Sequence, residues 1–180
     1  MHTVMALSLD LDDTLWPIWP TIERAELCLH EFLLLHAPKT AERFPIPGMR
    51  HLREHVAQEH PELAHDFTAQ RRISLSHAFR LTGESQDLVD PAFEAFFAAR
   101  NDVTLYQDCL PALEHLAAKL PIIALTNGNA DLQLTGVARF FTECISAKNI
   151  GSAKPETPMF EAASRALGIV PENILHVGDD

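Results

Sequence analysis

The stretch Ser8-Leu9-Asp10-Leu11-Asp12-Asp13-Thr14-Leu15-Trp16 decides the fold class of this chain. The residues before it, Val4-Met5-Ala6-Leu7, form a short apolar run that is typical of a buried strand in a parallel sheet. Because side chains two apart in an extended chain lie on the same face, Asp10 and Asp12 are expected to point together from the end of this strand. Open α/β sheets bind their ligands at this carboxyl edge.

Asp10 and Asp12 are the first candidates for chemistry. Two carboxylates held this close repel each other, and a divalent cation is the simplest way to relieve that repulsion. With Mg²⁺ present, one carboxylate can act as a nucleophile while the other transfers protons. Taken alone, the stretch could instead be a solvated, Asp-rich turn, because Asp is common in turns.

The composition indicates a globular chain with an acidic surface. The 180 residues fit one domain, or a core with a sizeable insert, and the apolar share of 47% is enough for a core. A formal net charge of −11 argues against nucleic acid and anionic membranes as main partners, because both require a basic surface. It is compatible with a small anionic substrate held by a local positive group. No apolar run approaches the roughly 18 residues needed to cross a membrane.

The three cysteines, Cys28, Cys109 and Cys144, are widely spaced, with no C-x-x-C pair and no zinc-ligand spacing. The start of the sequence has no apolar segment of the secretory kind. Both features favour a reducing compartment, so we expect a cytoplasmic protein whose cysteines are small core residues.

Residues 21–100 are expected to form an all-helical block that interrupts an α/β chain. Helices are expected over residues 21–35, 49–59, 61–81 and 87–99, with a proline-interrupted connector over 38–47. Arg71 interrupts the apolar stripe of the third of these helices. It could contact the polar part of a substrate, or its stem could pack while its head reaches water or a buried acid.

Strands and helices alternate again from Asp108 onward. Helices are expected over residues 111–119, 130–136 and 157–167, and strands over 121–126, 144–146 and 173–177. Together with the first strand, this order predicts an α/β fold with a parallel sheet.

Thr126 and Asn127 directly follow the second expected strand. Their hydroxyl and amide groups, together with backbone N–H groups of the turn at Gly128, can donate hydrogen bonds to phosphoryl oxygens. An ordinary Asn-Gly turn is the alternative interpretation.

Two more polar stretches complete the candidate site. Lys154 lies in the loop 151–157, stiffened by Pro155, where its charge could neutralise a nucleophile and a transferring phosphoryl group. Asp179 and Asp180 follow the last expected strand, where a carboxylate would complete the oxygen shell of Mg²⁺. Each of these groups could also be solvated, the lysine in its loop and the acids after their strand.

The order of these stretches resembles the four motifs of the haloacid dehalogenase-like (HAD) hydrolase superfamily. The motifs are D-L-D-D-T-L at 10–15, L-T-N at 125–127, K-P at 154–155 and V-G-D-D at 177–180. The resemblance implies a Rossmann-like parallel sheet with an all-helical cap inserted after the first motif. The catalytic core would then comprise residues 1–17 and 104–180, and the cap would comprise residues 18–103.

The same resemblance implies a role for each site residue. Asp10 would be the nucleophile that becomes an aspartyl-phosphate, and Asp12 would protonate the leaving oxygen and then deprotonate the attacking water. Thr126 would bind phosphate, and Lys154 would balance charge. Mg²⁺ would be held by Asp10, the backbone carbonyl of Asp12, and Asp179.

A finer resemblance concerns residues 60–68, 125–130 and 174–180. These stretches look like bacterial phosphatases that act on flavin mononucleotide and on 5-amino-6-(5-phosphoribitylamino)uracil, a riboflavin precursor. The expected activity is Mg²⁺-dependent hydrolysis of a small phosphorylated metabolite, with a place in riboflavin biosynthesis. Members of the superfamily continue past the last motif with a second acidic residue, a further strand and closing helices, so we expect a core that is truncated at its C-terminal end.

Two other functions share parts of this pattern. A haloacid dehalogenase would use a related aspartate to attack carbon, but that displacement needs neither a cation nor a proton donor at Asp12. A phospho-accepting signalling domain also gathers acids, Thr and Lys around Mg²⁺. It resembles a unit without a helical insert, however, and it has no proton-transferring acid two residues after the acceptor. Phosphatase activity is therefore the leading prediction.

Overall fold

The computed structural model of the chain describes residues 3–179, and the chain divides into two compact units. The sheet unit comprises the residues up to Ile18 and those from Val103 onward. The helical unit comprises Trp19–Asp102. The chain therefore leaves the sheet unit once, after the first strand, and returns to it for the rest of its length.

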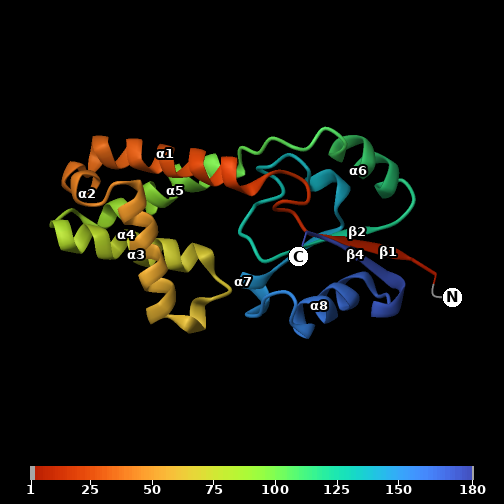
Figure 1. The fold of residues 1–180 in the computed structure, drawn as a ribbon. Coiled ribbons are helices and arrows are strands. Elements are labelled where there is room, and N and C mark those ends of the chain that lie inside the picture. The colour runs from red at the N-terminus through yellow and green to blue at the C-terminus, as the bar shows by residue number, and fades with distance from the viewer. Residues whose placement is uncertain (1–2, 180) are drawn as a thin grey trace. The chain divides into compact units, whose positions relative to one another are not determined.

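The sheet unit is built on four parallel strands in the order β3-β2-β1-β4 (Figure 1). The strands are β1 (Ala6–Leu9), β2 (Ile122–Thr126), β3 (Glu143–Ser146) and β4 (Ile174–Val177). Leu9 of β1 is in register with Ala124 of β2 and with Val177 of β4. The segments that follow these three strands therefore leave the sheet at the same edge, as the α/β prediction requires.

Helices cover both faces of this sheet, with α6 (Cys109–Ala117) on one face and α8 (Thr157–Leu167) on the other (Figure 1). Successive residues of a strand point to opposite faces, and β2 shows this directly. Ile122 joins a core cluster with Leu113 of α6, whereas Ile123 joins a cluster with Met159 of α8. The shorter elements are α7 (Ala147–Ile150) and the 3-10 helices η3 (Ala138–Phe140) and η4 (Pro171–Asn173).

The helical unit packs its helices around a separate apolar core. The helices are α1 (Ile18–His36), α2 (Pro38–Arg43), α3 (Ile46–Glu59), α4 (Phe67–Thr82) and α5 (Val89–Asn101), with 3-10 helices η1 (Pro61–Leu63) and η2 (Gln86–Leu88). Leu33, Leu75, Phe79 and Phe96 are among the fully buried side chains of this core. Within residues 3–179, no helix is both long enough and apolar enough to pass through a membrane.

Two boundaries near prolines differ from the sequence prediction. The first helix begins at Ile18 and not at residue 21, because the Asp13 carboxylate accepts a hydrogen bond from the Ile18 N–H (2.8 Å) and Pro20 needs no partner in the first turn. The expected connector over 38–47 contains α2, which starts at Pro38, and also the start of α3. Proline in the first turn of a helix loses no hydrogen bond. Helices α2 and α3 therefore both begin next to prolines that the prediction treated as breaks in helical structure.

Two expected helices are also corrected. The helix expected over 61–81 is divided, because the Asp66 carboxylate accepts from the Ala69 N–H (2.9 Å) and starts α4 anew after the short 3-10 helix. Residues 130–136, expected to be helical, form no helix, and turns occupy 132–136. There the Asp131 carboxylate accepts from the Gln133 N–H (2.7 Å), and Gly136 has a left-handed φ of +78°, which ends the turn before a helix forms.

Candidate active site

The site is organised by a buried ion pair at the carboxyl edge of the sheet. Asp10 directly follows β1, and its N–H donates to the Val177 carbonyl of the neighbouring strand (2.9 Å). Its Oδ1 accepts from the Leu11 N–H (2.7 Å), and its Oδ2 lies 2.7 Å from the Lys154 Nζ. The side chains of Lys154 and Asp10 are only 3% and 9% exposed. A carboxylate in this position is fixed in direction and has a cation directly beside it.

Asn127 holds the Lys154 loop in place. Its amide nitrogen donates to the Lys154 carbonyl (3.1 Å), and its amide oxygen accepts from the Lys154 N–H (2.7 Å). These two hydrogen bonds fasten the segment after β2 to a loop that is distant in the sequence. The sequence indicated Asn127 as a phosphate donor, whereas the structure shows both ends of its amide on the Lys154 backbone.

Thr126 ends β2 at the same edge, and its side chain is buried. Its Oγ1 accepts a hydrogen bond from the Gly128 N–H (2.9 Å), which shapes the turn. A hydroxyl that accepts in this way still carries a hydrogen to donate. This geometry is compatible with the predicted contact between Thr126 and a phosphoryl oxygen.

Asp12 is oriented by a tryptophan in its own loop. The Trp16 indole N–H donates to Asp12 Oδ1 (2.8 Å), and the Trp16 side chain is fully buried. The loop closes because Asp13 adopts a left-handed φ of +55° and donates its N–H to the Trp16 carbonyl (2.8 Å). Asp and Asn tolerate this backbone conformation better than bulkier residues. The buried indole is therefore a hydrogen-bond donor that holds the direction of the Asp12 carboxylate.

Several oxygen donors of the type that Mg²⁺ takes come from the segments at this edge. They are the Asp10 carboxylate, the backbone carbonyl of Asp12, and Asp179, which follows β4 and is exposed. Hard carboxylate and carbonyl oxygens fit this cation, so the donor chemistry is suitable. Among residues 3–179, however, no three His, Cys, Asp or Glu side chains are grouped as a metal site. Asp180, the other predicted acid, lies outside the described residues.

Arg71 belongs to the helical unit, on α4, and only 8% of it is exposed. Its guanidinium carbon lies 3.4 Å from the centroid of the Phe96 ring. Burial lowers the pKa of Arg71 to about 9, and the charges of Arg53 and Arg100 act in the same direction while Glu26 opposes them. The structure thus confirms that a charged group interrupts the apolar stripe.

Sequence reasoning missed the two contacts that position this site. The Trp16 N–H and the Asn127 amide were not recognised as the groups that hold Asp12 and Lys154. A tryptophan four residues after Asp12 was the available sequence signal for the first contact. No pattern in the sequence indicated the second.

The sheet unit and its edge place the chain among α/β proteins with a polar site where β1, β2 and β4 end. The chain belongs to the haloacid dehalogenase-like hydrolase family, whose sequence model matches residues 4–180. The protein is therefore a hydrolase. This membership confirms the resemblance of the four motifs and argues against a non-catalytic signalling domain.

The similar proteins include both phosphatases and a dehalogenase. A 5-amino-6-(5-phospho-D-ribitylamino)uracil phosphatase of Escherichia coli (strain K12) is 33% identical over 181 residues, which cover 98% of this chain and 76% of that protein. A phosphoserine phosphatase of Thermus thermophilus is 33% identical over 93 residues, covering 48% of this chain and 37% of that protein. A crystal structure of a 2-haloacid dehalogenase from Pseudomonas syringae is 34% identical, has a TM-score of 0.92, and is matched over 99% of this chain and 79% of that one.

Proposed function

We propose that this hydrolase is a Mg²⁺-dependent phosphomonoesterase that forms an aspartyl-phosphate on Asp10. The observation that carries the proposal is the buried contact between Asp10 Oδ2 and Lys154 Nζ at 2.7 Å. A nucleophilic carboxylate must stay ionised and must approach an anionic phosphoryl group, and a fixed cation beside it favours both.

The proposed reaction has two displacements at phosphorus. In the first, a carboxylate oxygen of Asp10 attacks phosphorus, the ester P–O bond breaks, and Asp12 gives its proton to the leaving oxygen. In the second, Asp12 takes a proton from water, the water oxygen attacks phosphorus, and the acyl-phosphate bond breaks to restore Asp10 and release phosphate. The indole N–H of Trp16 keeps the Asp12 carboxylate in one direction for both transfers (2.8 Å).

The remaining groups hold the phosphoryl oxygens and their charge. The Thr126 hydroxyl donates to one oxygen, and Lys154 offsets negative charge on the phosphoryl group and on Asp10. Asn127 acts by keeping the Lys154 loop in place, in addition to its predicted contact with phosphate. Mg²⁺, held by Asp10, the Asp12 carbonyl and Asp179, supplies further positive charge when it is bound.

The proposed substrate is a small phosphorylated metabolite, and the ribityl-phosphate precursor of riboflavin is the first candidate. Its support is the curated relative with that activity, which matches nearly the whole chain. We further propose that residues 18–103 act as a cap that selects the substrate, while residues 1–17 and 104–180 form the catalytic core. A cytoplasmic location is supported by three free cysteines within the described residues, at positions 28, 109 and 144.

Dehalogenation is the second candidate, because the structure with a TM-score of 0.92 is described as a 2-haloacid dehalogenase. The Asp12 carboxylate separates the two candidates. Displacement of halide from carbon requires no proton donor there, whereas this chain orients Asp12 with a hydrogen bond from the buried Trp16 side chain. A screen that measures phosphate release from phosphorylated metabolites and halide release from 2-haloacids, run in parallel, tests the choice. Halide release without phosphate release would overturn the phosphatase proposal.

Removal of the metal gives the first prediction. Treatment with EDTA is expected to lower phosphate release from an aryl phosphate by about 100-fold, because charge at the phosphoryl group is then less well balanced. Addition of excess Mg²⁺ is expected to restore the rate, and both rates are measured by following free phosphate. Unchanged turnover after exhaustive EDTA treatment would contradict the Mg²⁺ requirement.

The indole of Trp16 gives the second prediction. Trp16→Phe keeps a buried aromatic ring but removes the N–H that donates to Asp12, so kcat is expected to fall about 10-fold with little change in KM. Steady-state kinetics with an aryl phosphate measure both constants. The matched control is Trp19→Phe, since Trp19 is exposed. Equal kcat values for the two variants would show that Trp16 is only a packing residue.

A further inference from the structure

A small pocket lies inside the helical unit, between three of its helices. Its lining comes from one face each of α1 and α3 and from one residue of α4: Glu26, Leu29, His30, Leu33, Ile46, Met49, Arg50 and Arg71. The pocket contains about 270 Å³ of empty space including its opening to solvent, and the centre of a water molecule can occupy about 10 Å³ of it. It therefore admits one small polar group.

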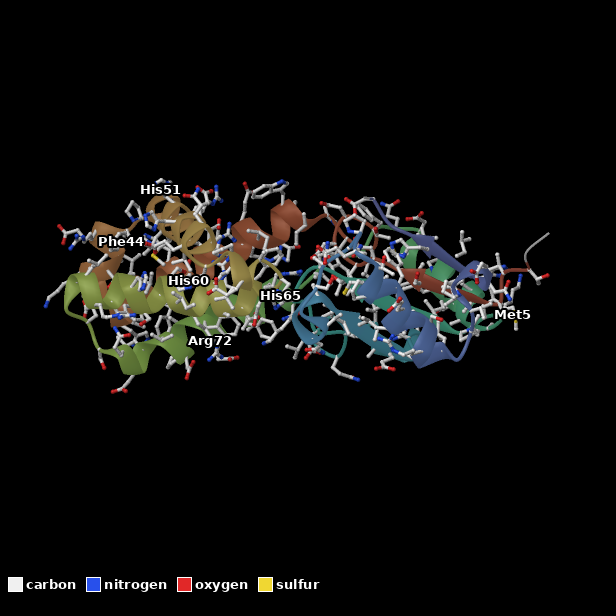
Figure 2. All side chains as sticks on the ribbon, turned by 90° about the horizontal axis from the view of Figure 1, so that it is seen from below. Met5, Phe44, His51, His60, His65 and Arg72 are labelled. Carbon is white, nitrogen blue, oxygen red and sulfur yellow. The ribbon has the colours of Figure 1, made fainter. Side chains whose placement is uncertain are left out.

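Arg71 lines this pocket, and its guanidinium has no hydrogen-bond partner among residues 3–179. The contact recorded for it within residues 3–179 is with the face of Phe96, which cannot accept the five N–H bonds of a guanidinium. The next residue shows the ordinary arrangement. Arg72, labelled in Figure 2, pairs with Asp90 and with Glu94. Arg71 is thus a buried cation in the wall of the pocket, stacked on a ring that cannot satisfy its N–H groups.

The acid in the pocket does not neutralise Arg71, because it is already paired. Glu26 Oε2 accepts from Arg50, with Nε at 2.7 Å and Nη2 at 2.5 Å. Burial and the nearby charges of Arg53 and Arg100 lower the pKa of Arg71 to about 9. The lining contains one carboxylate, that of Glu26, and two guanidiniums, those of Arg50 and Arg71. The pocket therefore has an excess of positive charge.

A second polar side chain, that of His30, also belongs to the lining. The Nδ1 atom of His30 is buried and has no hydrogen-bond partner in the part of the chain that the structure describes. His30 lies one turn after Glu26 on α1, so both contribute to the lining. Buried polar atoms are nearly always partnered, so the His30 Nδ1 atom and the buried Arg71 side chain on the same lining favour a polar ligand.

We propose that this pocket binds the carboxylate of a small organic anion. A carboxylate is planar and accepts two parallel hydrogen bonds from a guanidinium, so it matches Arg71 in shape and in charge. It is also smaller than a phosphate group, as the limited space requires. The apolar side chains Leu29, Leu33 and Met49 would contact the carbon atoms attached to it.

Acetate alone is the probe for this site. Its addition to the protein is expected to shift the Arg71 Nε–Hε resonance and the His30 ring resonances saturably, as followed by ¹H–¹⁵N and ¹H–¹³C correlation spectra. At ten times the Kd, the ligand is expected to raise Tm by about 4 °C. Arg71→Met should abolish the rise in Tm, whereas Arg80→Met, which changes an exposed arginine of the same helix, should keep it.

Two results would overturn the proposal. One is that acetate causes no saturable shift of the Arg71 resonance. The other is that acetate raises the Tm of Arg71→Met as much as that of the wild type. If Arg71→Met does not fold, Arg71→Lys keeps the charge but lacks the planar fork, and it is expected to weaken acetate binding at least 5-fold. Unweakened binding by the lysine variant would also contradict a guanidinium–carboxylate pair.

The carboxylate could belong to the substrate or to a separate ligand, and a pair of esters distinguishes these sources. The two substrates are phosphoglycolate and its carboxamide, which keeps the phosphate but lacks the carboxylate charge, and kcat/KM is measured for each. A loss of about 10-fold in Arg71→Met for the acid alone would assign the carboxylate to the substrate. Equal values, with acetate binding retained in the wild type, would assign it to a separate ligand. Acetate binding needs no turnover, so a failure of phosphate release would contradict the proposed function without affecting the pocket.

Discussion

Asp10→Asn is expected to abolish phosphate release from an aryl phosphate, with a loss of at least ~10⁴-fold in kcat. The amide has nearly the same shape as the carboxylate and can still accept a hydrogen bond from the Leu11 N–H, but it lacks the anionic oxygen that attacks phosphorus. Single-turnover kinetics with a phosphate assay measure the loss. A rapid acid quench of the wild type during turnover is expected to trap one phosphoryl group on Asp10, which mass spectrometry of the peptide detects.

Asp13→Asn is the matched control for this variant. Asp13 neighbours the site and is exposed, and its carboxylate accepts a hydrogen bond from the Ile18 N–H, a bond that an amide oxygen can also accept. Asn tolerates the left-handed backbone at this position. We expect kcat within about 3-fold of the wild type, since a surface change of this kind has a small effect. Turnover by Asp10→Asn at the rate of Asp13→Asn would exclude Asp10 as the nucleophile.

The sequence predicted the edge of the sheet at which the polar groups gather because strand ends are visible in it. Apolar runs identify β1, β2 and β4, and residues such as Asp10 and Thr126 stand where those runs stop. In a parallel sheet, all such ends share one edge, so no knowledge of the loops was needed. The 2.7 Å contact between Asp10 and Lys154 is a more specific fact that only the coordinates supply.

The contacts that position the site could not be predicted, because they depend on the path of loops. Asn127 bonds to the backbone of Lys154 across 27 residues, and both of its hydrogen bonds require a defined loop conformation. Trp16 reaches Asp12 only because Asp13 takes a left-handed conformation that turns the chain back. Helix α2 was missed for a similar local reason, since its six residues make fewer than two turns and show no apolar period.

Lys154→Met is expected to lower the free energy of unfolding by about 3 kcal/mol and kcat by about 10³-fold. Met fills much the same volume, but it removes the cation that faces the buried Asp10 carboxylate, and an uncompensated buried charge is strongly unfavourable. Denaturant unfolding monitored by circular dichroism measures the first quantity, and phosphate release measures the second. Lys148→Met, at an exposed lysine of α7, is the control and should change neither by much.

The double variant Asp10→Asn with Lys154→Met separates charge from packing. If the pair stabilises the fold only by balancing charge, removing both charges should recover most of the stability lost in Lys154→Met, because neither group then remains buried and unbalanced. Activity should stay at the level of Asp10→Asn, since the nucleophile is absent. Such a result would mean that the fold does not need this ion pair for stability, and that the pair is kept for its chemistry. Additive losses of stability in the double variant would instead show that the two side chains act separately, and the argument for a charge-matched nucleophile would fail.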